Sequence, residues 1–168
     1  LRFYRVGEDS FWYDEAGQAI ASIQPRFADM LLAVRQHAGA MPLDYLISRL
    51  MASISLSETV MRFPSVVWGT LSIPACYLLL CQFDIPNKKQ IAILVALMVS
   101  ISPVNIQYSQ EMRFYPALRL FYTLSTFFLM KAIKAPLIKN WLFYILITSI
   151  GMYFHPYALM VSITGAVL

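Results

Sequence analysis

The sequence has few charged side chains. Asp, Glu, Lys and Arg make up 13% of its 168 residues, about half the share that is usual in soluble domains. Apolar residues make up 59%. This composition excludes an ordinary soluble domain of this length, so we expect a lipid bilayer as the solvent. We expect no nucleic-acid partner.

Cysteines are few, and several common motifs are missing. The two cysteines, Cys76 and Cys81, lie in or near one apolar segment at a spacing that suits neither a disulfide framework nor a zinc site. We interpret them as packing or lipid-facing residues. The sequence contains no Gly-rich phosphate loop and no HExxH, CxxC or GxSxG motif, which excludes the enzyme classes that depend on them.

Long apolar runs are abundant, and they predict an all-α, polytopic membrane helix bundle. A spanning helix needs roughly 20 apolar residues, or slightly fewer with anchoring flanks. Four segments approach this length: Ser65–Cys81, Ile91–Ser102, Arg119–Met130 and Trp141–Phe154. A fifth run, Tyr157–Leu168, reaches the end of the chain. Because the chain starts at Leu1 and stops inside that run, we expect an N-terminal piece of a longer protein.

The lysines predict the orientation of the bundle. All five lie in two short segments, residues 88–89 and 131–139, which the positive-inside rule assigns to the cytoplasm. Alternating the spans then brings three segments to the outer face: residues 1–64, residues 103–113 and the surroundings of His155. We expect these three segments to converge there.

The first 64 residues form a separate part, the first outer loop, ahead of the bundle at residues 65–168. Apolar residues recur at helical spacing after Pro25 and again after Pro42, and proline is well tolerated in the first turn of a helix. We expect two amphipathic helices that lie on the membrane surface.

Two adjacent carboxylates, Asp14 and Glu15, stand beside aromatic residues in this loop. Adjacent acids point in different directions on almost any backbone, so one can catalyse while the other anchors. The alternative is a solvated acidic turn or a helix cap.

Ionisable residues also occur close to the spans. Glu111 and Arg113 lie where one short apolar span meets the next, and Arg119 follows inside that next span. Charges at such depth are costly and are usually paired or functional, so a structural ion pair is the alternative to a functional site. His155 ends a span on the same face, and either a structural or a functional role is open for it.

Several motifs together resemble the GT-C membrane glycosyltransferases. The resemblance is strongest to the bacterial branch related to protein O-mannosyltransferases and to the lipid A aminoarabinose transferase. It is carried, in order along nearly the whole chain, by WYDE at residues 12–15, PLDYLI at 42–47, MRFPSVVWG at 61–69 and YSQEMRFY at 108–115.

The resemblance implies roles for individual residues. Asp14, in the Asp14–Glu15 pair, takes the place of the family's catalytic base. Glu111, Arg113 and Tyr115 match a segment that lines the cavity for the lipid phosphate, and His155 falls where many members carry a histidine. Arg113 would neutralise the departing phosphate, with help from Arg62 or from a divalent metal ion held by Glu111.

The resemblance also implies the reaction. The protein would move a hexose or pentose from a polyprenyl-phosphate donor to a hydroxyl of a lipid, glycan or protein acceptor, with inversion. The site would lie on the outer face of a bacterial plasma membrane. Two alternatives are a flippase or transporter of lipid-linked sugars and a non-catalytic membrane subunit.

Overall fold

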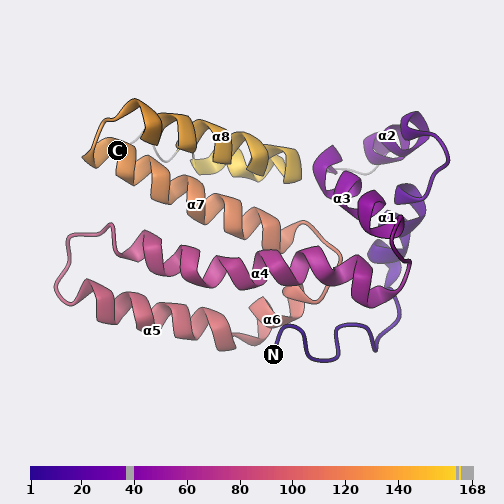
Figure 1. The fold of residues 1–168 in the computed structure, drawn as a ribbon, viewed down its shortest axis with the longest axis horizontal. Coiled ribbons are helices and arrows are strands. Elements are labelled where there is room, and N and C mark those ends of the chain that lie inside the picture. The colour runs from indigo at the N-terminus through magenta and orange to yellow at the C-terminus, as the bar shows by residue number, and fades with distance from the viewer. Residues whose placement is uncertain (37–39, 162, 164–168) are drawn as a thin grey trace.

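The computed structural model describes residues 1–36, 40–161 and 163. This part of the chain is all-α, as predicted, and contains no strand. The helices, seen in Figure 1, are α1 (Tyr13–Ser22), α2 (Phe27–Gln36), α3 (Pro42–Ala52), α4 (Glu58–Leu80), α5 (Lys88–Ile101), α6 (Pro103–Ser109), α7 (Tyr115–Lys134) and α8 (Ile138–Phe154), followed by a short 3-10 helix, η1 (Pro156–Leu159).

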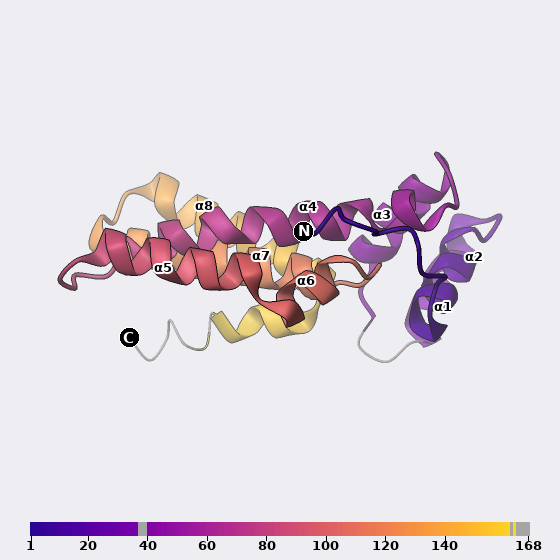
Figure 2. The ribbon, with the colours of Figure 1, turned by 90° about the horizontal axis from the view of Figure 1, so that it is seen from below.

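Four long helices form a bundle, and the short helices gather at one of its ends. In Figure 1, α4 lies between α5 and α7, and α8 packs on the far side of α7. The connections from α4 to α5 and from α7 to α8 lie at one end of the bundle, while α1, α2 and α3 lie at the other (Figures 1 and 2).

The four predicted spans correspond to α4, α5, α7 and α8, with shifted ends. The largest shift is at the start of α4, which begins at Glu58 rather than Ser65 and continues through Pro64. Among the described helices, α4 alone is by itself long and apolar enough to cross a membrane, and α7 and α8 do not meet this criterion. The bent pair of α5 and α6, at 59° to each other, adds a second crossing if it counts as one broken span. The end of the predicted fifth run lies outside the described residues.

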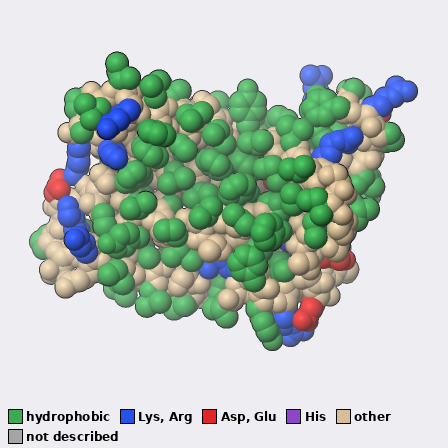
Figure 3. All heavy atoms as spheres, in the orientation of Figure 1, with side chains coloured by type: hydrophobic (Ala, Val, Ile, Leu, Met, Phe, Trp, Pro, Cys, Tyr) green, Lys and Arg blue, Asp and Glu red, His purple; other side chains and the backbone are tan. Residues whose placement is uncertain are grey.

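The bundle has small and polar residues inside and large apolar residues outside. The buried residues of α4 include Ser65, Gly69, Ser72 and Ala75, whereas the outward residues of α5 and α8 are mostly leucine, isoleucine, methionine and phenylalanine. Figure 3 shows hydrophobic side chains across the middle of one face and charged side chains mainly toward its margins. Small residues between helices and apolar residues outside are typical of helices packed in lipid.

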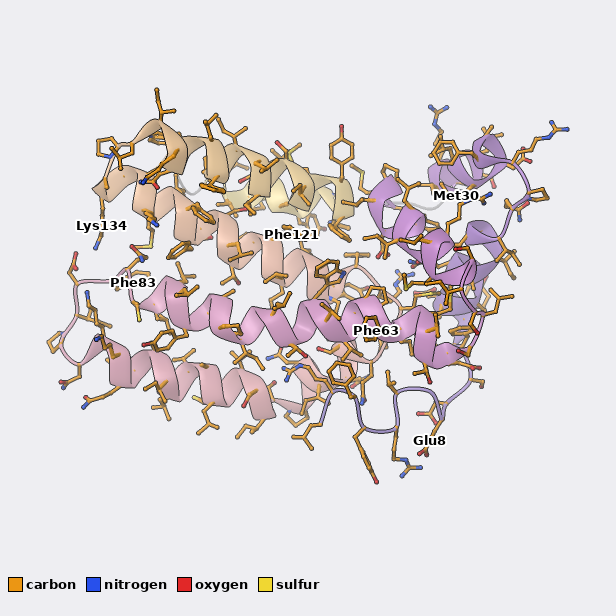
Figure 4. All side chains as sticks on the ribbon, viewed as in Figure 1. Glu8, Met30, Phe63, Phe83, Phe121 and Lys134 are labelled. Atoms are coloured by element: carbon orange, nitrogen blue, oxygen red, sulfur yellow. The ribbon has the colours of Figure 1, made fainter. Side chains whose placement is uncertain are left out.

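The lysine-bearing segments share one end of the bundle, as the orientation argument required. Lys134, at the end of α7, forms an ion pair with Asp84 in the connection between α4 and α5. Figure 4 shows Lys134 pointing toward the connection that carries Phe83. Lys88 approaches the same carboxylate at 3.9 Å. The basic residues of the two segments are therefore on one side, opposite to α1–α3 (Figure 1).

Of the two predicted surface helices, α3 begins at Pro42 as predicted, and α2 begins at Phe27, two residues after Pro25. They pack together with α1 around a small core that contains Ala21, Met30, Val34 and Tyr45. Helix α1 was not predicted as a helix, and neither was α6.

Close approach of α4 and α6 fixes the bend between α5 and α6. Gly69 of α4 faces Ser109 of α6, and a β-carbon on Gly69 would lie 2.0 Å from the Ser109 hydroxyl oxygen. Arg2 donates from Nε to that hydroxyl at 3.2 Å and from its two terminal nitrogens to the carbonyl oxygens of Val99 and Ser100. The N-terminal segment therefore holds the end of α5 and the start of the bend.

We expect Gly69→Ala to lower the free energy of unfolding by about 1–3 kcal/mol, because the added methyl overpacks the contact with Ser109. Thermal unfolding in detergent measures the loss. Combining the change with Ser109→Gly, which removes both clashing atoms, should give less than the sum of the two single effects. Strict additivity would show that Gly69 and Ser109 do not make this contact.

Candidate active site

A cavity of about 350 Å³ lies at the end of the bundle that carries the short helices. Its walls come from α1, α3, the segment that precedes α7 and the end of α8. The residues that line it are Asp14, Gln18, Ala40, Met41, Asp44, Tyr45, Arg113, Phe114, Tyr115, Phe154 and His155. The three segments expected to converge therefore do so around one cavity.

Asp14 and Arg113 face each other across this cavity. An Arg113 terminal nitrogen lies 3.6 Å from Asp14 Oδ2, and the Asp14 side chain is 39% exposed. The Arg113 guanidinium also lies over the rings of Phe114 and Tyr115, at 5.6 and 5.8 Å. Its Nε is buried and has no hydrogen-bond partner among the described residues.

Glu15 and Arg62 form a buried ion pair on the other side of α1. Their side chains are 0% and 6% exposed, and Arg62 donates to both carboxylate oxygens of Glu15, from Nε at 2.9 Å and from a terminal nitrogen at 2.7 Å. Arg62 also donates to the carbonyl oxygens of Val6, Asp9 and Ser10. These five hydrogen bonds use every N–H group of the guanidinium, so none is left for a phosphate.

Glu15 connects this pair to the segment before α7. Its Oε1 accepts the backbone N–H of Met112 at 2.5 Å. Adjacent acids therefore do point in different directions: Asp14 lines the cavity, while Glu15 ties α1 to α4 and to residues 111–114.

Tyr115 and His155 stand at the cavity wall with Phe114 between them. The imidazole of His155 stacks on the Phe114 ring with centroids 4.3 Å apart, and the Tyr115 ring lies 4.4 Å from the Phe114 ring. His155 Nδ1 accepts the backbone N–H of Tyr157, so the neutral ring carries its proton on Nε2. Burial lowers the pKa of His155, which favours this neutral form.

Glu111 lies in a different cavity from Asp14. It shares a cavity of about 270 Å³ with Glu15 and Arg62 and accepts a hydrogen bond from Gln107. Burial raises its pKa. Within the part of the chain that the structure describes, no group of three His, Cys, Asp or Glu side chains is arranged so that it could hold a metal ion. The residues present therefore do not make a complete metal site around Glu111.

Sequence reasoning missed two polar residues of the main cavity, Gln18 and Asp44. Gln18 donates from its amide to Asp44 Oδ2 at 2.8 Å and to the Ser48 hydroxyl at 2.9 Å. The signal was two pairs of polar residues four positions apart, Asp14 and Gln18 on α1 and Asp44 and Ser48 on α3. Such spacing puts both members on one face of a helix.

Burial at the cavity wall raises the pKa of Asp44 to about 6, and the Gln18 amide and the positive charge of Arg113 oppose the rise. Tyr45, beside it, also has a raised pKa because it is buried. Ionisation of Asp44 therefore lowers the stability of the folded protein.

One protein family matches the chain. The family model described as dolichyl-phosphate-mannose-protein mannosyltransferase matches residues 37–168. The match includes α3, the bundle and the cavity residues from Asp44 to His155, and Asp14 and Glu15 precede it. No curated protein and no solved structure matches the chain.

We expect Glu15→Gln to lower the free energy of unfolding by about 3–5 kcal/mol, because it leaves the buried charge of Arg62 without its partner. Thermal unfolding of the purified protein in detergent checks this. Glu8→Gln is the matched control, since Glu8 pairs with Arg5 at the surface, with side chains 54% and 62% exposed, where a pair contributes under about 1 kcal/mol. Equal losses in the two variants would contradict the anchoring role of Glu15.

We expect Asp44→Asn to stabilise the protein more as the pH rises. Because the folded pKa, about 6, exceeds the ordinary 3.8, ionising Asp44 costs stability above about pH 6 and costs nothing below about pH 4. The gain should therefore develop between these values and reach at most about 3 kcal/mol. Unfolding at about pH 4 and pH 7.5 measures it. Ser48→Ala, which removes another partner of Gln18 without an ionisable group, should have the same effect at both pH values.

Proposed function

The chain belongs to the dolichyl-phosphate-mannose-protein mannosyltransferase family, and we propose that it moves a sugar from a polyprenyl phosphate to an acceptor hydroxyl. The family is one of membrane glycosyltransferases of the GT-C type. The observation that carries the proposal is the cavity in which Asp14, Arg113, Tyr115 and His155 meet. These side chains supply a carboxylate base and cationic or N–H donors for a phosphate within one cavity.

Asp14 acts as the general base. Its carboxylate is partly exposed to the cavity and borders Arg113. It takes the proton of the acceptor hydroxyl, whose oxygen then attacks the anomeric carbon from the face opposite the phosphate. The bond from that carbon to the phosphate oxygen breaks as the new glycosidic bond forms, so the configuration inverts.

Arg113, with Tyr115 and His155, receives the leaving phosphate. Arg113 has an unpaired buried Nε, and a guanidinium suits the planar, two-point binding of phosphate oxygens. His155 in its neutral form can donate from Nε2, because Nδ1 is occupied by the Tyr157 N–H. Charge stabilisation of this kind acts strongly in a site from which water is excluded.

Glu15 and Arg62 hold the site rather than take part in the chemistry. Their hydrogen bonds are to each other and to the backbone of three segments. A divalent metal ion at Glu111 stays a prediction from the family resemblance, and no step of this mechanism depends on it.

The cavity faces the outer side of the membrane in this proposal. It lies at the end of the bundle opposite to the lysine-bearing connections (Figure 1), and lysine-rich connections favour the cytoplasmic side. The exposed apolar faces of α5 and α8 contact lipid, and the donor's tail stays in the bilayer beside them. The acceptor is a lipid, a glycan or a protein, and the membrane is a bacterial plasma membrane.

We expect Asp14→Asn to reduce transfer by about 100- to 10,000-fold, the usual contribution of a general base. The assay is release of labelled sugar from a radiolabelled polyprenyl-phosphate mannose by membranes that carry the protein. Asp29→Asn, in α2 and away from the residues that line the cavity, should keep the activity.

Equal transfer by the Asp14→Asn variant and the wild type would remove Asp14 from the mechanism. Movement of the labelled lipid across the membrane without transfer would instead favour a flippase of lipid-linked sugars. Melting temperatures of both variants, measured in parallel, separate loss of a base from loss of folded protein.

A further inference from the structure

A second carboxylate, Asp44, lines the cavity that holds Asp14, and the mechanism above gives it no role. It lies in the first turn of α3, whereas Asp14 lies in the first turn of α1. The two helices pack against each other. The cavity wall therefore presents carboxyl groups from two separate helices.

A buried glutamine, Gln18, fixes the orientation of the Asp44 side chain. Gln18 is 2% exposed, and its amide nitrogen divides its two N–H groups between Asp44 Oδ2 and the Ser48 hydroxyl. The Ser48 hydroxyl in turn donates to the backbone carbonyl of Asp44 at 3.0 Å. The side-chain hydrogen bond that the Asp44 carboxylate accepts from the described residues comes from Gln18 and goes to Oδ2. One oxygen is thus held by Gln18, and the carboxylate lines the cavity.

In the part of the chain that the structure describes, no Lys, Arg or His side chain forms an ion pair with Asp44. Among the described residues, Arg113 forms its ion pair with Asp14, and it acts on Asp44 only through its field at longer range. Retaining a half-buried carboxylate without an ion-pair partner is costly, and burial accordingly raises its pKa. Such a cost is typical of functional sites.

A purely structural role for Asp44, as an acid at the start of α3, explains these observations less well. An acid in the first turn of a helix interacts favourably with the helix dipole, and Asp44 has that place in α3. The dipole, however, does not require a buried glutamine to hold the carboxylate against a cavity wall. A ligand group that needs a fixed acceptor does.

We propose that Asp44 is a specificity-determining residue that accepts a hydrogen bond from a ring hydroxyl of the donor sugar. This inference rests on the proposed function. With the phosphate at Arg113 and the acceptor hydroxyl at Asp14, the sugar ring lies between them, and the carboxylate of Asp44 meets its hydroxyl groups. A carboxylate is a strong acceptor for a hydroxyl, and the bond is charge-assisted.

The test uses membranes that carry the protein and a set of radiolabelled polyprenyl-phosphate mannose donors. One donor is complete, and each of the others has one ring hydroxyl replaced by hydrogen. We expect Asp44→Ala to raise KM for the complete donor by about 10- to 100-fold, with a much smaller change in kcat, because a charge-assisted hydrogen bond is lost. Asp44→Asn, which keeps one acceptor oxygen, should restore part of the loss.

One deoxy donor should identify the hydroxyl that Asp44 binds. For that donor, the wild type should already show the raised KM, and Asp44→Ala should add nothing further, since the contact no longer exists. For the other deoxy donors the effect of Asp44→Ala should remain. Ser48→Ala is the control, because it disturbs α3 but keeps the Asp44 carboxylate. Its effect on KM should be the same for every donor.

Two results would overturn the inference and differ from each other. If the wild type transfers sugar but Asp44→Ala has the same KM, or loses activity equally with every donor, Asp44 is a structural acid of α3 and the proposed function stands. If the wild type transfers sugar from no donor in the set, the proposed function fails and the role of Asp44 fails with it.

Discussion

The buried ion pair between Arg62 and Glu15 is the interaction on which the arrangement of the site depends. Arg62 belongs to the bundle, in α4, and Glu15 belongs to α1. Arg62 also donates hydrogen bonds to the carbonyl groups of residues 6, 9 and 10. Glu15 also accepts a hydrogen bond from the backbone N–H of Met112. In the sequence, Asp14 is next to Glu15 and Arg113 is next to Met112. Their approach across the cavity therefore follows from an interaction in which neither takes part.

The bundle and the site obey different constraints. Many of the buried residues of α4, α7 and α8 are small or weakly polar, such as Gly69, Ser72 and Ala117, which allows close helix contacts. Most of the outward residues of α5 and α8 are large and apolar. Charged groups gather at the two ends (Figure 3). Pro103 and Pro116 stand in the first turns of α6 and α7, and residues from the stretch between these two helices line two cavities. Irregular backbone is tolerated at such a place because it is covered by protein.

The sequence predicted the long helices well and two short ones poorly, for physical reasons. Apolar runs marked α4, α5, α7 and α8, and helical spacing marked α2 and α3. Helix α1 escaped because its buried face carries Glu15, Gln18 and Ser22, so that apolar periodicity does not reveal it. Helix α6 has seven residues, too few for a periodic pattern. Similarly, Asp44 stood in the sequence as one acid in an apolar stretch, and its partner Gln18 is 26 residues away.

By itself, the sequence determined the helical class, the apolar character of the bundle and the common end of the lysine-bearing segments, because these depend on composition and on spacing within a few residues. It also resembled the family to which the chain belongs. Only the tertiary structure decided that Glu15 anchors while Asp14 borders the cavity, that Glu111 lies in a separate cavity, and that Arg62 has no free donor. These facts depend on contacts between residues 47 and 97 positions apart. No local pattern encodes which partner a buried charge will find at that separation.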